Sequence, residues 1–136
     1  PDGLPERLIG ADPGWWVREK LRRWAADPDA FAPEALEEYV GCFSDPAAIH
    51  ASCEDYRAGA TVDDQHDAAD LGRRRIACPV LALWGEEGIS RRAEDPLAAW
   101  RPWCDHVDGH SVPGGHFLAE ESPAETLAAL ERFFSG

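Results

Sequence analysis

The sequence predicts an α/β fold, in which a helical segment over residues 1–73 precedes the last two strand–helix units of a mostly parallel sheet over residues 74–136. Three observations support this prediction. Pairs of an acidic residue and a proline, which favour helix starts, punctuate the first part of the chain. A short apolar run at 80–85 ends at a glycine, as buried parallel strands do. The remainder of the chain alternates helix-like and strand-like stretches.

The helical segment is predicted from its start signals. Asp and Ser side chains cap free N–H groups, and a following proline supplies the backbone angle of the first helical residue. These signals predict helices over 13–26, 33–43, 46–59 and 63–73. Apolar residues recur at helical spacing in the second of them. The five residues at the start of the chain, Pro1–Pro5, are typical of a loop.

The second segment begins at Arg74, where the pattern of residues changes from helix-like to strand-like. A strand is predicted over 80–85, a helix over 96–103, a strand over 106–112 and a helix over 123–134. The last helix has four apolar residues on one side, as expected of a helix packed on a sheet: Leu127, Leu130, Phe133 and Phe134. Two parallel strands leave unpaired edges, and the chain contains no Met, so we expect the C-terminal part of a larger protein.

Composition excludes several classes of function. The 136 residues carry a formal net charge of −13, which repels phosphate backbones and anionic lipid. No apolar run approaches the roughly 20 residues of a membrane span. The four cysteines are far apart, which favours reduced thiols and a cytoplasmic protein. Cys104, His106 and His110 are too few for a structural zinc site, and we expect no metal.

His116 is the first candidate for catalysis. It follows a predicted strand and the turn Pro113–Gly115, and ligands of open α/β sheets bind at the carboxyl ends of strands. A histidine there can take and return a proton near neutral pH. The alternative is a loop histidine that is bonded to a nearby carboxylate such as Glu120 or Glu121.

Two stretches carry a more specific resemblance. The segment 113–123, P-G-G-H-F-L-A-E-E-S-P, together with L-A-L-W-G at 81–85, resembles the C-terminal end of α/β-hydrolases. The segments 33–39 and 42–43, and above all C-E-D-Y-R-A-G-A at 53–60, resemble the cap domain of fluoroacetate (haloacetate) dehalogenases. The resemblance covers nearly the whole chain. It implies a helical cap at 1–73 and part of the hydrolase core at 74–136.

This resemblance implies a mechanism and site residues. In the family, an aspartate displaces halide from the α-carbon of a haloacetate, and a histidine activates the water that hydrolyses the resulting ester. His116 matches that histidine, and Tyr56 matches the cap tyrosine that helps hold the halide. Trp24 is a weaker candidate for the apolar wall over the substrate. The alternative for Tyr56 is a packing role as an aromatic of the cap core. The alternative for Trp24 is a packing role like that of Trp15 and Trp16. The chemistry needs no cofactor, and relatives suggest a homodimer.

Several parts of the family's site have no counterpart in the sequence. The nucleophilic Asp, the arginines that clamp the substrate carboxylate and the triad carboxylate would all precede Pro1. Glu86 and Glu87 follow the first predicted strand, but we expect them to be solvated loop carboxylates. An epoxide hydrolase of the same fold is the alternative enzyme, for which Tyr39 would be the second tyrosine. A catalytically incomplete interaction module is the alternative from another class.

Overall fold

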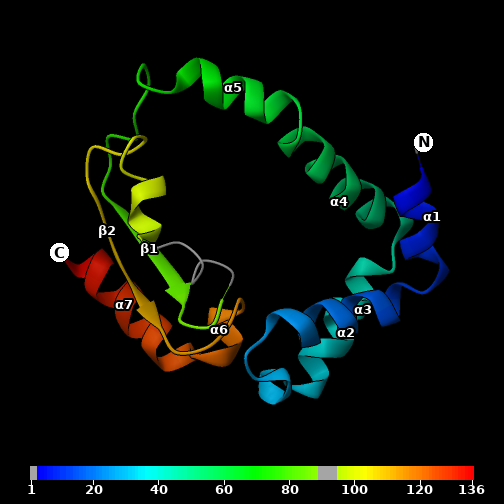
Figure 1. Ribbon diagram of the computed structural model, residues 1–136. Coiled ribbons are helices and arrows are strands. Elements are labelled where there is room, and N and C mark those ends of the chain that lie inside the picture. Colours follow the sequence, from blue (N-terminus) through cyan, green and yellow to red (C-terminus); the bar gives the residue numbers. More distant parts are fainter. Residues whose placement is uncertain (1–2, 89–94) are drawn as a thin grey trace. The chain divides into compact units, whose positions relative to one another are not determined.

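The computed structural model describes residues 3–88 and 95–136, and the chain divides into two compact units (Figure 1). The first unit comprises Pro1–Arg22 and Phe31–Asp70, and the second comprises Arg23–Ala30 and Leu71–Gly136. The domain boundary after residue 73 stays a prediction. The short segment Arg23–Ala30 nevertheless groups with the C-terminal residues, so a piece of the helical half helps to build the second unit.

The N-terminal half is helical, as predicted. Its elements are α1 (Leu4–Ala11), α2 (Pro13–Trp24), a 3₁₀ turn η1 (Pro28–Ala30), α3 (Pro33–Phe43), α4 (Pro46–Gly59) and α5 (Val62–Asp70). Three of the four predicted helix starts fall on the observed first residue, because proline is pre-set for that position. At α4, the Asp45 carboxylate accepts a hydrogen bond from the Ala47 amide at 2.8 Å, which is the expected cap.

The boundaries differ from the predictions at three places. Residues 4–11 form a helix where a loop was expected, with Pro5 in its first turn; Pro1 and Asp2 lie outside the described residues. The second helix ends at Trp24 rather than at residue 26, because the Ala26 and Asp27 amides donate to a carboxylate outside the helix. The helix predicted over 63–73 covers 62–70, and Gly72 then turns the chain at a φ of 74°.

The core of the first unit lies between α1 and α4. Ile9, Ile49 and Cys53 form a buried cluster, and Trp16 and Phe43 pack against it. Ile49 is 3% exposed, so it is the most enclosed member of this cluster. Burial of these apolar side chains stabilises the contact between the two helices.

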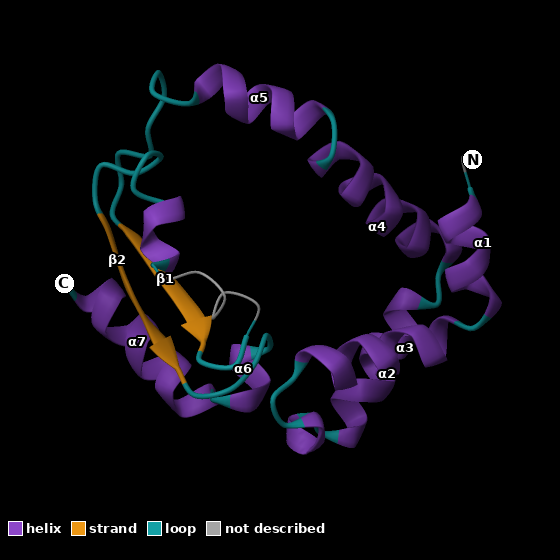
Figure 2. Ribbon diagram, in the orientation of Figure 1, coloured by secondary structure: helices purple, strands orange, loops and turns teal. Residues whose placement is uncertain are grey.

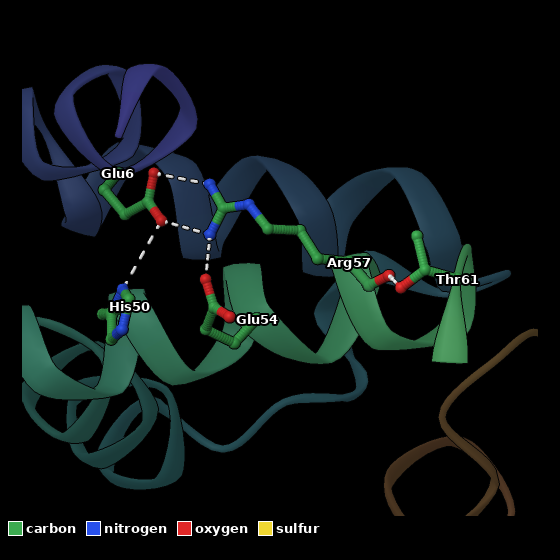
Figure 3. A network of polar contacts seen from close by, with 5 residues as sticks. All are labelled: Glu6, His50, Glu54, Arg57 and Thr61. Carbon is green, nitrogen blue, oxygen red and sulfur yellow. Dashed lines mark hydrogen bonds and ion pairs between the residues drawn. The ribbon is translucent and has the colours of Figure 1, made fainter. Parts of the chain in front are cut away.

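An ion-pair network joins the same two helices (Figure 3). The Arg57 guanidinium donates to both carboxylate oxygens of Glu6, at 2.6 and 3.0 Å, and also to Glu54 at 2.5 Å. The bond from Arg57 lowers the pKa of Glu6 to about 2, and the two carboxylates raise the pKa of Arg57. The network therefore ties α1 to α4 by charge as well as by apolar contact.

The second unit contains a two-stranded parallel sheet (Figure 2). Strand β1 (Val80–Gly85) pairs with β2 (Val107–Val112), with Val80 opposite Val107 and Gly85 opposite Val112. Both strands confirm the predictions to within a residue. The helix expected over 96–103 is only a 3₁₀ turn, η3 (Pro96–Ala99). Pro102 accounts for the difference, because a proline disfavours helical backbone at the residue before it.

Two helices follow the sheet, α6 (Leu118–Glu121) and α7 (Pro123–Ser135). Of the four apolar residues of α7 that were predicted to face the sheet, only Phe133 is not exposed among the described residues. Ala129 is 3% exposed and, with Phe133, lines a cavity that Leu81 of β1 also lines. Leu127, Leu130 and Phe134 are exposed, so the small side chain of Ala129 rather than the leucines makes the close approach. None of the described helices is both long enough and apolar enough to cross a bilayer.

Candidate functional site

The loop that carries His116 leaves the carboxyl end of β2. Gly114 has a φ of 106°, which only glycine adopts readily. Gly115 is enclosed by backbone, because a Cβ added there would lie 2.4 Å from the Ala26 nitrogen and 2.7 Å from the Trp24 oxygen. Gly85, the last residue of β1, lies so close that a Cβ on it would be 1.8 Å from the Gly115 oxygen. The absence of a side chain at Gly85 and Gly115 thus lets the histidine loop pass between β1 and the segment after α2.

His116 is held against Trp24. The His116 amide donates to the Trp24 carbonyl at 3.0 Å, and the two rings meet edge to face with their centroids 5.0 Å apart. The Phe117 ring also meets the His116 ring edge to face, with their centroids 5.1 Å apart. His116 itself is exposed, so its imidazole is accessible to a ligand. The structure therefore brings together two of the three residues that the resemblance singles out.

Glu121, one of the two carboxylates named as alternative partners of the His116 imidazole, is engaged by backbone amides instead. Both carboxylate oxygens of Glu121 are taken by backbone amides. The hydrogen bonds described for the Glu121 carboxylate therefore go to backbone amides rather than to the imidazole.

Glu121 is the site residue whose role the sequence did not reveal. One of its oxygens accepts from the amides of Ala26, Asp27 and Gly115 at 2.6, 3.1 and 2.9 Å. The other accepts from the Phe117 amide at 3.0 Å. Partial burial raises the pKa of Glu121, but these backbone bonds outweigh it and the net pKa lies below its usual range. The sequence signal that could have indicated this role is its position four residues after Phe117, where a carboxylate can accept from free amides at a helix start.

An apolar cavity of about 390 Å³ adjoins His116. Its lining comes from the ends of the strands and the histidine loop: Leu83, Trp84, Gly85, Gly88, Gly115, His116 and Leu118. Glu86 and Glu87 are exposed beside it, as expected of solvated loop carboxylates. Their amides donate to the carbonyls of Val112 and Gly114 at 3.0 and 2.9 Å, which fixes the loop after β1 to the histidine loop.

Tyr56 lies in the first unit, on α4, and is 61% exposed. The Lys20 ammonium donates to its hydroxyl oxygen at 3.2 Å and lies over its ring at 5.2 Å and over the Trp16 ring at 5.7 Å. These residues line a mostly apolar cavity of about 510 Å³. The full lining is Pro5, Ile9, Trp16, Lys20, Ser52, Cys53, Tyr56, Arg57 and Ala60. A cation and a phenol therefore stand together at an apolar wall.

Two further side chains of this cavity, Cys53 and Arg57, are less suited to chemistry. Burial raises the pKa of the Cys53 thiol, which disfavours the nucleophilic thiolate. Arg57 is paired with Glu6 and Glu54. The same two carboxylates and His50 could in principle hold a metal ion, since their ligand atoms lie within 4.8 Å of one another. The Arg57 guanidinium already supplies the positive charge there.

Comparisons with known proteins show which fold the chain has. No protein-family model matches it. A solved structure from Nostoc sp PCC 7120, provisionally described as an alpha/beta hydrolase, superposes on 98% of the chain with a TM-score of 0.93 and 54% sequence identity. The chain has the fold of part of an α/β-hydrolase. It covers 46% of that α/β-hydrolase structure.

Two curated proteins are also similar to this chain. A fluoroacetate dehalogenase from Burkholderia sp is 42% identical over 136 residues, which are 99% of this chain and 44% of the relative. A soluble epoxide hydrolase from Corynebacterium sp. (strain C12) is 30% identical over 131 residues, 94% of this chain and 44% of that protein. The resemblance to fluoroacetate dehalogenases is thereby confirmed. The chain spans less than half the length of the curated relatives that it matches.

Proposed function

We propose that this chain supplies the halide-binding cap and the catalytic histidine of an enzyme that hydrolyses haloacetates to glycolate and halide. The observation that carries the proposal is the Lys20–Tyr56 contact of 3.2 Å at an apolar wall. Because Lys20 donates to the phenol oxygen, it draws electron density from the Tyr56 O–H and strengthens that group as a donor. A departing halide needs such a donor, since negative charge develops on it in the transition state.

The proposed reaction has two steps. A carboxylate that the chain does not contain attacks the α-carbon, so a carbon–oxygen bond forms while the carbon–halogen bond breaks and halide leaves to Tyr56. His116 then takes a proton from water, and the hydroxide attacks the ester carbonyl carbon, so the bond from that carbon to the glycolate oxygen breaks. The departing oxygen takes the proton of the new carboxylic acid, which leaves glycolate and the free carboxylate, and the imidazolium returns its proton to solvent. The exposed imidazole beside the apolar cavity suits this second step.

The local charges fit an anionic substrate in an acidic protein. The chain has a net charge of −13, so its mean field repels a haloacetate. Lys20 offers a positive charge at the wall that Tyr56 lines. We assign Trp24 to positioning His116, since it contacts both the backbone and the ring of that residue.

An epoxide hydrolase is the second candidate, and the Corynebacterium relative favours it. Its chemistry would use two tyrosines to protonate an opening oxide. Among the described residues that line the Tyr56 cavity, Tyr56 is the one tyrosine, because Tyr39 lies on α3 and does not contribute to that lining. This supports dehalogenation over epoxide opening.

The test is halide release from fluoroacetate and chloroacetate by the complete protein, meaning this chain with preceding residues that supply the carboxylate. We expect Tyr56→Phe to lower fluoride release by about 100-fold and chloride release by less, because fluoride is the poorer leaving group. Tyr39→Phe is the matched control and should leave both rates unchanged. Hydrolysis of a test epoxide without halide release would transfer the function to the second candidate.

A further inference from the structure

We propose that Glu121 is the positioning residue that holds His116 for catalysis, by clamping the backbone on both sides of the histidine to the segment after α2. The inference rests on the proposed function for its kinetic consequence. Its structural part concerns only the second unit and can be tested by itself.

Glu121 binds the residues immediately before and after His116. The residue before it, Gly115, and the residue after it, Phe117, both donate their amides to Glu121, at 2.9 and 3.0 Å. The His116 amide is held separately by the Trp24 carbonyl at 3.0 Å. Three consecutive amides of the loop are therefore fixed, and the backbone from which the imidazole projects has no free N–H to reorient.

The same carboxylate also fixes the surface on which the imidazole rests. Ala26 and Asp27 donate to the oxygen that Gly115 uses, at 2.6 and 3.1 Å. Trp24, whose ring meets the His116 ring at 5.0 Å, is two residues away from Ala26. One side chain thus sets the spacing between His116 and Trp24, although these two residues are 92 positions apart in sequence.

The clamp needs an ionised carboxylate with both oxygens as acceptors. Glutamine is isosteric, but its amide nitrogen would face an N–H donor in either orientation. The less costly orientation places that nitrogen against the Phe117 amide, because only one hydrogen bond is then lost instead of three. The lost bond is the one from the Phe117 amide, directly after His116. A misplacement of about 1 Å at a reacting group can lower a rate by about 100-fold, so the loss should be visible in catalysis.

The experiment compares Glu121→Gln with Glu125→Gln in the complete protein. Glu125 is exposed in the first turn of α7 and undergoes the same carboxylate-to-amide change. We expect Glu121→Gln to slow hydrolysis of the ester between about 10- and 100-fold, with ester formation in a single turnover nearly unchanged. Glu125→Gln should match the parent protein in both steps.

A second readout is independent of the reaction. In isotope-labelled protein, we expect a nuclear Overhauser effect between the Trp24 and His116 rings, which Glu121→Gln weakens and Glu125→Gln retains. If the parent protein forms no ester, the proposed function fails, and the ring–ring signal alone decides the role of Glu121. If Glu121→Gln does not fold, Glu121→Asp is measured in the same way, because it keeps the charge but is one methylene too short to serve both oxygens' partners.

The proposal is overturned by an unchanged ring–ring signal together with parent-like ester hydrolysis in the folded Glu121 variant. Equal loss of ester formation and ester hydrolysis would overturn it as well, because that result indicates a general structural role. A selective loss of hydrolysis with a weakened Trp24–His116 signal supports it.

Discussion

Replacing Gly115 by alanine tests a close backbone contact beneath the candidate site. The new Cβ would lie 2.4 Å from the Ala26 nitrogen, 2.7 Å from the Trp24 oxygen and 2.9 Å from the Ala25 carbonyl carbon, whereas ordinary contact begins at 3.4 Å. Gly115 does not have a positive φ, so the cost is steric rather than conformational. All three neighbours are backbone atoms, which cannot rotate away, and the two segments must separate by about 1 Å.

Overpacking of this kind costs about 1–3 kcal/mol, and we expect Gly115→Ala to fall near the upper end. The assay is urea unfolding of the complete protein, with Gly59→Ala as the matched control. Gly59 is the last residue of α4 and has no atom within 4 Å of its added Cβ, so alanine there should cause no steric loss of stability. A cost below about 1 kcal/mol for Gly115→Ala would refute the close approach of the two segments.

Three further changes probe the packing and the charges. Ile49→Ala, at the 3% exposed centre of the first unit, should lower the free energy of unfolding by about 2–5 kcal/mol in urea titrations; Ile49→Val should cost less. Ser122→Ala removes the 2.6 Å bond that the 5% exposed Ser122 hydroxyl donates to the Pro113 carbonyl, and should cost about 1–3 kcal/mol in the same measurement. Glu6 has a folded pKa of about 2 against an ordinary 4.5, so its ion pair stabilises above pH 4.5 and is lost as pH falls toward 2. Glu6→Gln should therefore be less stable than the parent at pH 7 and converge with it at low pH; a constant difference would contradict this linkage.

Helix starts were predictable because their causes are local. Proline sets the first backbone angle of α2, α3 and α4, and the preceding Asp45 caps the last of these with its own side chain. Strand β1 was predictable from an apolar run that ends at a glycine, and β2 from a strand-like stretch that ends at the turn Pro113–Gly115. The first helix was missed because its eight residues offer one buried side chain, Ile9, and no long period.

The candidate site was predictable only at His116, where glycines and a strand end lie next to one another in sequence. The partners that hold it come from about 90 residues away in the chain, and no local pattern reports such a pairing. Glu121 illustrates the difficulty. Its side chain could equally have met the imidazole, and only the path of the segment after α2 directs it to backbone amides instead.

The same reason explains the face of α7. Periodicity identified an apolar stripe, but which face meets a sheet depends on how closely the backbones approach. Ala129 permits that approach, and Phe134 remains 80% exposed.

The measurement that bears most directly on the proposed mechanism is the intact mass of the complete protein carrying His116→Ala, after exposure to chloroacetate. Because water activation is removed while halide displacement is retained, we expect one covalent ester per protein and one equivalent of chloride, with no further turnover. Absence of the ester, or steady chloride release at the parent rate, would contradict the role assigned to His116.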